Sequence, residues 1–270
     1  VFFPHMRRHL RGVVVVTAAW VLSCTGTIIV SHNSHEGSHF LCESFRSFCY
    51  QAECVELFDP GRNSGRIPWG AIHRQDVALL RMRSDDVSNE TIRDDDVVIV
   101  LVRCSLMDWT ISEYVKRNQA DLDPTIVAKY SDPQFIDSVD LEPLTYDIHL
   151  VKRTAKILVS KWREKIDLLR ALKERRRRYR IVAYEDFLDD GAELIRTFTK
   201  ETLDDEPPCA YRPVNYTVHR VHTGQIEDFA INYEAVVRHF RKSDYPTWGN
   251  LSADFDDDRV PLHLGASVCQ

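Results

Sequence analysis

The sequence lacks several patterns that would assign a protein class at once. None of its seven cysteines forms a CxxC pair, which excludes a zinc ribbon and a thioredoxin-type motif. No loop ends in Gly-Lys-Ser/Thr, so a Walker A nucleotide site is absent. Ten glycines and eleven prolines among 270 residues exclude a collagen-like or low-complexity chain. The 35 basic residues are outnumbered by 41 acidic ones, and this net charge of −6 argues against a nucleic-acid partner.

The first 26 residues differ in character from the rest. Three arginines within residues 7–11 precede an apolar run over 12–22, as in a signal peptide. With residues 27–30 added, the run approaches the roughly 20 residues that span a bilayer, so a single-pass anchor is also open. The third alternative is a buried strand over 13–16. Glycosylation sequons begin at Asn89, Asn215 and Asn250. We expect a secretory-pathway protein of the Golgi lumen or membrane, with a cytoplasmic location as the alternative.

From residue 27 onward, short apolar segments alternate with amphipathic ones. The apolar run Val97–Val102 is typical of a strand buried on both faces of a parallel sheet. The expected strands are 27–30, 54–58, 97–102 and 180–184, and the expected helices are 40–48, 69–83, 109–119, 144–179, 186–201 and 229–241. This alternation predicts an α/β fold, a three-layer sandwich around a mostly parallel sheet. The domain would cover 27–250, and residues 251–270 would form a C-terminal tail.

The loop after the first expected strand runs directly into a helix. Gly37 allows close approach there, and the backbone N–H groups of a helix N-terminus bind anions. A plain strand–helix connection is the alternative. Histidines 32, 35 and 39 also raise the possibility of zinc, but no HExxH motif or nearby cysteine completes the ligand set. We expect no metal.

An arginine follows the long apolar strand. Arg103, with Ser112 on the helix behind it, is suited to hold a phosphate by charge-assisted hydrogen bonds. The alternative is a surface arginine close to Asp108.

In this order, the segments resemble the sulfotransferases. Residues 31–41 are similar to the 5′-phosphosulfate loop of that family, and residues 98–114 to its 3′-phosphate motif. The segment 180–188, which contains Tyr-Glu-Asp at 184–186, is similar to a strand end of the family. Residues 226–248 resemble the closing helix and tail of its bacterial-type branch. The resemblance covers about residues 27 to 250.

The resemblance implies a P-loop NTPase-like fold and a donor, 3′-phosphoadenosine 5′-phosphosulfate. A sulfuryl group would pass to a hydroxyl without a metal, leaving adenosine 3′,5′-bisphosphate. His35 matches the family's basic loop residue and would be a catalytic cation. The positions implied for donor binding are Ser34, His35, Glu36, Gly37, Ser38, His39, Arg103, Ser112, Tyr184 and Arg220.

The acceptor side is less specific. We expect a hydroxyl-bearing carbohydrate, with Glu56 or His73 as the base that removes its proton; the alternative for both residues is a structural role. A second hypothesis is a degenerate member of the same fold that binds a glycan or partner without transfer. Glu36 favours it, because a carboxylate there repels an anion. A third hypothesis is a P-loop phosphotransferase, but the sequence lacks the Lys-Ser/Thr pair of that class.

Overall fold

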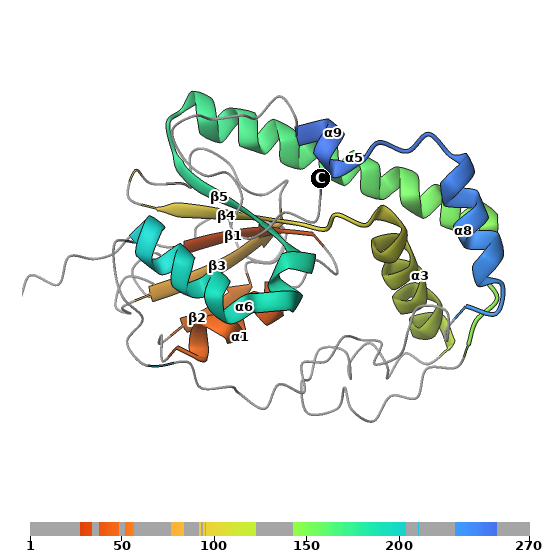
Figure 1. Ribbon diagram of the computed structural model, residues 1–270, viewed down its shortest axis with the longest axis horizontal. Coiled ribbons are helices and arrows are strands. Elements are labelled where there is room, and N and C mark those ends of the chain that lie inside the picture. Colours follow the sequence, from red (N-terminus) through yellow and green to blue (C-terminus); the bar gives the residue numbers. More distant parts are fainter. Residues whose placement is uncertain are drawn as a thin grey trace, which may run out of the picture.

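The protein is described from a computed structural model (Figure 1). The structure describes residues 28–33, 38–48, 52–56, 77–83, 92, 94, 96–122, 143–203, 210 and 230–252. The predicted N-terminal segment 1–26, most of the tail, Ser34–Gly37, His73 and Arg220 lie outside the described residues.

Five parallel strands form a single sheet in the order β2-β3-β1-β4-β5. Their bounds are Ile28–His32 (β1), Ala52–Glu56 (β2), Val77–Arg83 (β3), Val97–Val102 (β4) and Arg178–Ala183 (β5). The predicted α/β class and parallel sheet are confirmed. The order differs from the two common doubly wound orders, because β3 lies between β2 and β1.

Helices cover both faces of the sheet. Their bounds are Ser38–Arg46 (α1), Leu106–Leu122 (α3), Ile148–Glu174 (α5), Tyr184–Phe198 (α6), Tyr233–Lys242 (α8) and Trp248–Ser252 (α9), with a π-helical turn at Thr199–Leu203. Figure 1 shows α5 and α9 on one side of the strands and α1 and α6 on the other. Within the described ranges, no helix is both long and apolar enough to cross a membrane.

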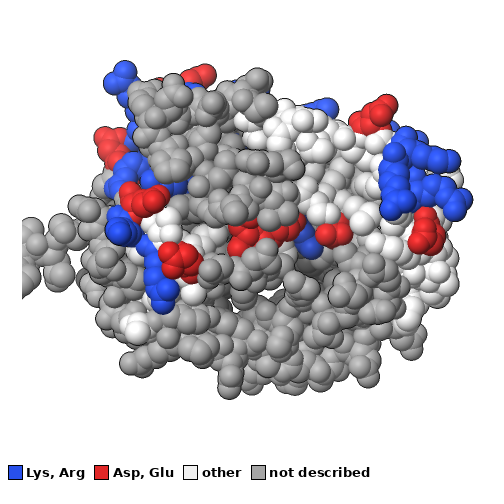
Figure 2. Space-filling view, viewed as in Figure 1, with Lys and Arg blue, Asp and Glu red and all other residues white. Residues whose placement is uncertain are grey.

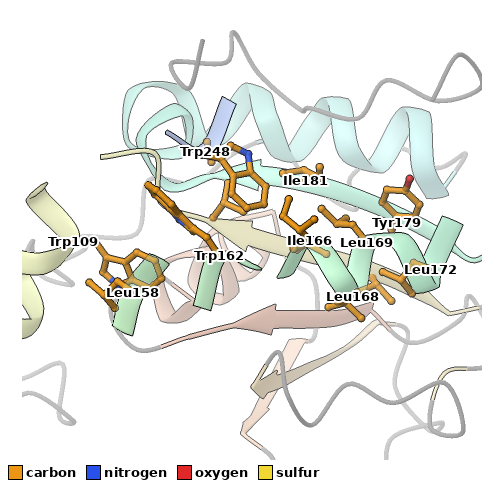
Figure 3. Close-up of a cluster of buried hydrophobic side chains, with 14 of the residues drawn as sticks. Trp109, Leu158, Trp162, Ile166, Leu168, Leu169, Leu172, Tyr179, Ile181 and Trp248 are labelled. Carbon is orange, nitrogen blue, oxygen red and sulfur yellow. The ribbon is translucent and has the colours of Figure 1, made fainter. Parts of the chain in front are cut away.

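Side chains alternate along the strands, so each face of the sheet has its own core. On the α5 face, Val98, Val100 and Ile181 share one core with the buried stripe of that helix. Figure 3 shows Ile181 beside Ile166 and Leu169 of α5. Trp162 of α5 lies at the centre of this core, with ring centroids 6.2 Å from Trp109 and 6.3 Å from Trp248. The opposite core joins the other residues of β1 and β4 to α1 and α6. Burial on both faces explains the uninterrupted apolar sequence of β4.

The prediction of a helix over 69–83 is wrong where the structure describes it. Residues 77–83 form β3, which pairs with β1 on one side and β2 on the other. Residues 69–76 lie outside the described residues. Short apolar runs fit either periodicity, and here two neighbouring strands supply backbone partners that override the local helical spacing.

Candidate functional site

The chain reverses its direction across the sheet between β1 and β4. These strands are neighbours, but the chain leaves β1 towards β2 and leaves β4 towards β5. The helix that follows β1 packs on one face, and the helices that follow β4 pack on the other. In open α/β sheets, ligands bind at the carboxyl ends of the strands at such a switch point. The carboxyl ends of β1 and β4 are therefore the candidate site.

The segment after β4 is held by one carboxylate from α6, the helix that follows the neighbouring strand β5. Glu185, the second residue of α6, accepts hydrogen bonds from the backbone N–H groups of Cys104 (3.0 Å) and Ser105 (3.2 Å). Its Oε1 also lies 4.0 Å from Nε of Arg103. These contacts join the end of β4 to the start of α6. Ser105 in turn caps α3, because its hydroxyl accepts from the N–H of Asp108 at 3.2 Å.

An aromatic ring lies beside the same arginine. The guanidinium carbon of Arg103 is 4.9 Å from the ring centroid of Tyr184, a cation–π distance. The Arg103 side chain is only 13% exposed, and that of Glu185 20%. Charge interactions are stronger where water is partly excluded, so the ring and the carboxylate together orient the guanidinium.

Helix α5 binds the end of β4 from the other face. Trp162 donates from its ring N–H to the carbonyl of Arg103 at 3.1 Å. Lys165, one turn later, is completely buried and donates from its ammonium to the carbonyl of Leu101. Carbonyls at the end of a strand need partners when buried, and α5 supplies them. The backbone of Arg103 is thus fixed by α5, and its side chain by α6.

The structure brings together some of the predicted donor residues. Arg103 and Tyr184 are in contact. Ser112 is buried on α3, and within the described residues no hydrogen bond joins it to Arg103. Ser38 is buried at the first position of α1, and His39 follows it in the same helix, so the helix begins where the loop was predicted to end.

Glu56 lies within the predicted second strand and is the last residue of β2. Register puts it level with Arg81 of β3, and Arg81 level with Val30 of β1. β2 is therefore two strands away from β1, about 10 Å at ordinary strand spacing. Glu56 is thus level with Val30, which lies two residues before the end of β1 at His32.

Of histidines 32, 35 and 39, His35 lies outside the described residues. Among the described residues, no group of three His, Cys, Asp or Glu side chains is arranged to hold a metal ion. His32 is buried at the end of β1, with its Nδ1 3.2 Å from the carbonyl of Asn33.

The sequence analysis missed Glu185 and Lys165. Glu185 lies inside the predicted Tyr-Glu-Asp segment, but its partners are 80 and 81 residues away in the chain. Lys165 has a signal that could have found it, since it is a lysine on the apolar stripe of α5 between Trp162 and Leu169. A charge at such a position requires a buried partner.

Comparisons with protein-family models, with curated proteins and with solved structures found no match to this chain. The candidate site is therefore defined by the topology of the sheet and by the contacts around Arg103.

Proposed function

We propose that this chain is a sulfotransferase, which moves a sulfuryl group from 3′-phosphoadenosine 5′-phosphosulfate to a carbohydrate hydroxyl. One observation carries the proposal. The helix that follows β1 begins at the same edge of the sheet from which Arg103 leaves the adjacent strand β4. The donor has two anionic groups at opposite ends of one nucleoside. A P-loop-like arrangement of strand, loop and helix suits the 5′ group, and Arg103 suits the 3′-phosphate.

The chemistry of the residues fits such a donor. The start of α1 carries no acidic residue in its first turn, so the positive end of its dipole is uncompensated there. Arg103 is oriented in advance by Tyr184 and Glu185, which reduces the entropy lost when a phosphate binds. In the proposal, Ser38 and the loop before it surround the phosphosulfate, and Ser112 assists Arg103.

The donor supplies the sulfuryl group. The bond from sulfur to the 5′-phosphate oxygen breaks, and a bond from sulfur to the acceptor oxygen forms. His35, in the loop before α1, would stabilise negative charge on the departing oxygen. Glu56 or His73 would take the acceptor's proton. Tyr184 would lie near the adenine end of the donor, and Arg220 would contact its 3′-phosphate.

Binding of adenosine 3′,5′-bisphosphate tests the donor site directly. A ligand at 100 times its Kd stabilises a protein by about 2.7 kcal/mol, so a rise in Tm is expected at millimolar concentrations. Adenosine 5′-monophosphate, which lacks the 3′-phosphate, is the matched control and should stabilise much less. Transfer of labelled sulfate to a panel of glycans then tests catalysis. Equal shifts with both nucleotides, or none with either, would reject the proposed donor.

A second candidate is a protein of the same fold that binds a glycan or partner without transfer. Two carboxylates favour it. Glu36 lies in the predicted phosphosulfate loop, and Glu185 is 4.0 Å from Arg103. Both oppose anion binding by electrostatic repulsion. Glycan binding without any bisphosphate-dependent stabilisation would select this candidate over the sulfotransferase.

We also propose that the protein resides in the secretory pathway, in the Golgi lumen or membrane. Cys104 is disulfide-bonded, and disulfides persist in oxidising compartments. Asn250, which begins the third sequon, is exposed on α9. An unchanged electrophoretic mobility after enzymatic deglycosylation of the protein made in a secretory host would argue against this location.

A further inference from the structure

Six exposed cations gather on two neighbouring helices. They are Lys152, Arg153 and Lys156 of α5 and Arg238, Arg241 and Lys242 of α8. We call this set the α5–α8 basic surface. The two helices are in contact, and Lys152 is close enough to His239 of α8 to lower the pKa of that histidine, an effect second to burial. Figure 2 shows Lys and Arg side chains gathered at the end of the molecule where Figure 1 places α8.

The cations of this surface form no ion pair with the carboxylates that the structure describes. Residues 148–163 of α5 contain no Asp or Glu at all. Among the described residues, the exposed acids in or directly beside these helix segments are Asp147, Glu234 and Asp244. The surface therefore has an excess of positive charge in a protein whose net charge is −6.

Helix stability does not account for the cations of α5. Lys152 and Lys156 are one turn apart, and like charges at this spacing repel. They also lie beyond the first turn of α5 and far from its last turn, so the helix dipole does not favour them. Arg241 and Lys242 do lie in the last turn of α8, where the dipole favours them. Interactions within the helix therefore do not stabilise the α5 cations, and their charges are available to an anionic partner.

The basic surface lies at the same end of the molecule as the candidate site. Trp162 of α5 bonds to the carbonyl of Arg103, just after β4. Lys152 precedes Trp162 by ten residues, about 15 Å of helix. Figure 1 accordingly shows the first half of α5, together with α3 and α8, beyond the carboxyl ends of the strands.

The composition of the surface distinguishes between polyanions. Surfaces that bind a bilayer combine cations with apolar anchors and are enriched in Trp and Tyr. The exposed large apolar side chains of the described residues, Leu150 (45%), Ile157 (39%) and Ile231 (68%), lie in or beside these helix segments, but none is aromatic. A duplex partner is disfavoured by the net negative charge. A linear acidic polysaccharide needs only rows of cations on an exposed face.

We propose that the α5–α8 basic surface binds an acidic polysaccharide, one that carries carboxylate or sulfate groups, and holds it across the end of the molecule that contains the candidate site. As an acceptor class, this polysaccharide rests on the proposed sulfotransferase function. Binding to the surface itself depends only on its charges.

Charge reversal on the full chain tests this proposal. The test variants are Lys152→Glu/Lys156→Glu and Arg238→Glu/Lys242→Glu. The control, Arg176→Glu/Lys200→Glu, makes the same change in net charge at exposed positions after the ends of α5 and α6, at the opposite end of the molecule. Binding of chondroitin sulfate and hyaluronan is measured at about 0.15 M salt, with neutral dextran as the uncharged probe.

We expect each test variant to lose at least tenfold in affinity for the acidic polysaccharides, with a shallower dependence on salt. The control should lose less than threefold, and dextran should not bind. Equal losses in all three variants would overturn the proposal, because net charge alone would explain binding. It would also be overturned if duplex DNA or vesicles containing anionic lipid bound the same residues more tightly than either polysaccharide.

Folding of the variants is checked by Tm. Removing like-charge repulsion on α5 should leave the Tm of Lys152→Gln/Lys156→Gln unchanged or higher, so this milder variant serves if charge reversal impairs folding. Polysaccharide binding that depends on the surface, without stabilisation by bisphosphate, would reject the transferase function and retain this inference. Bisphosphate-dependent transfer, together with acidic-polysaccharide binding that the α5 variants do not weaken, would reject this inference and retain the transferase function.

Discussion

Oε1 of Glu185 lies 4.0 Å from Nε of Arg103, while the same carboxylate accepts backbone hydrogen bonds from Cys104 and Ser105. This side chain therefore holds the segment after β4 and, together with the Tyr184 ring, orients its arginine.

Removal of the Glu185 carboxylate should destabilise the fold. Glu185→Ala leaves two N–H groups and a partly buried guanidinium without this partner, and hydrogen bonds to charged groups contribute about 1.5–3 kcal/mol. Urea unfolding measures the loss. Glu193→Ala, which breaks an exposed pair with Arg196, is the control and should change the free energy of unfolding by about 1 kcal/mol or less. Similar losses in both variants would contradict a special role for Glu185.

Arg103→Ala should weaken binding of adenosine 3′,5′-bisphosphate by about 1.5–3 kcal/mol, because a charge-assisted contact to the 3′-phosphate is lost. Arg103→Lys should restore only part of this affinity, since lysine lacks the planar fork that stacks on Tyr184. Calorimetric titration measures both. Unchanged affinity in folded Arg103→Ala would remove this residue from the donor site.

Replacement by phenylalanine should affect the free energy of unfolding differently at two buried tryptophans. Trp162→Phe removes the hydrogen bond to the Arg103 carbonyl and should cost about 0.5–1.5 kcal/mol beyond the change in packing. The ring N–H of Trp248 is buried and has no hydrogen-bond partner within the described residues, so Trp248→Phe removes no such bond. Chemical denaturation of both variants compares them, and a larger loss in Trp248→Phe would contradict the contact at Arg103.

Stability should fall as the pH is lowered through the range below the ordinary histidine value of 6.5. Burial, and secondarily Lys152, lowers the pKa of His239 in the folded protein, so the unfolded chain binds more protons on acidification. The stabilising contribution is fully present above pH 6.5 and is lost as the pH falls through the folded pKa. His239→Gln should reduce the slope of Tm against pH between 7 and 5, and Lys152→Gln should reduce it in part. Parallel profiles for all three proteins would exclude His239 as the source.

The proposed cation at His35 predicts an opposite trend for activity. An unperturbed histidine is charged only below about pH 6.5, so sulfuryl transfer should decline as the pH rises through that value. His35→Lys should extend the active range as a plateau, since lysine keeps its charge. Rates of labelled-sulfate transfer between pH 6 and 8 are the measurement. A flat profile, or full activity in His35→Ala, would reject His35 as the cation.

Elements with a strong local pattern could be predicted from the sequence. β4 is confirmed residue for residue as Val97–Val102, because six apolar residues in a row suit only a strand buried on both faces at that length. The predicted helix over 144–179 contains α5, whose apolar stripe repeats at helical spacing. β3 was missed because a seven-residue segment carries too little periodicity to separate strand from helix.

The candidate site also has one part that the sequence predicted and another that only the tertiary structure decided. The sequence alone determined that Arg103 follows a central strand, since the arginine directly succeeds the apolar run. Only the tertiary structure decided what surrounds it. β4 pairs with β5 in parallel, with Val102 level with Ala183. This pairing brings Glu185 to the backbone N–H groups of Ser105 and Cys104, which lie 80 and 81 positions earlier in the chain. Packing of α5 over the sheet brings Trp162 and Lys165 to the last carbonyls of β4. Such contacts are set by the spacing of strands and layers in space, which local propensity and periodicity do not encode.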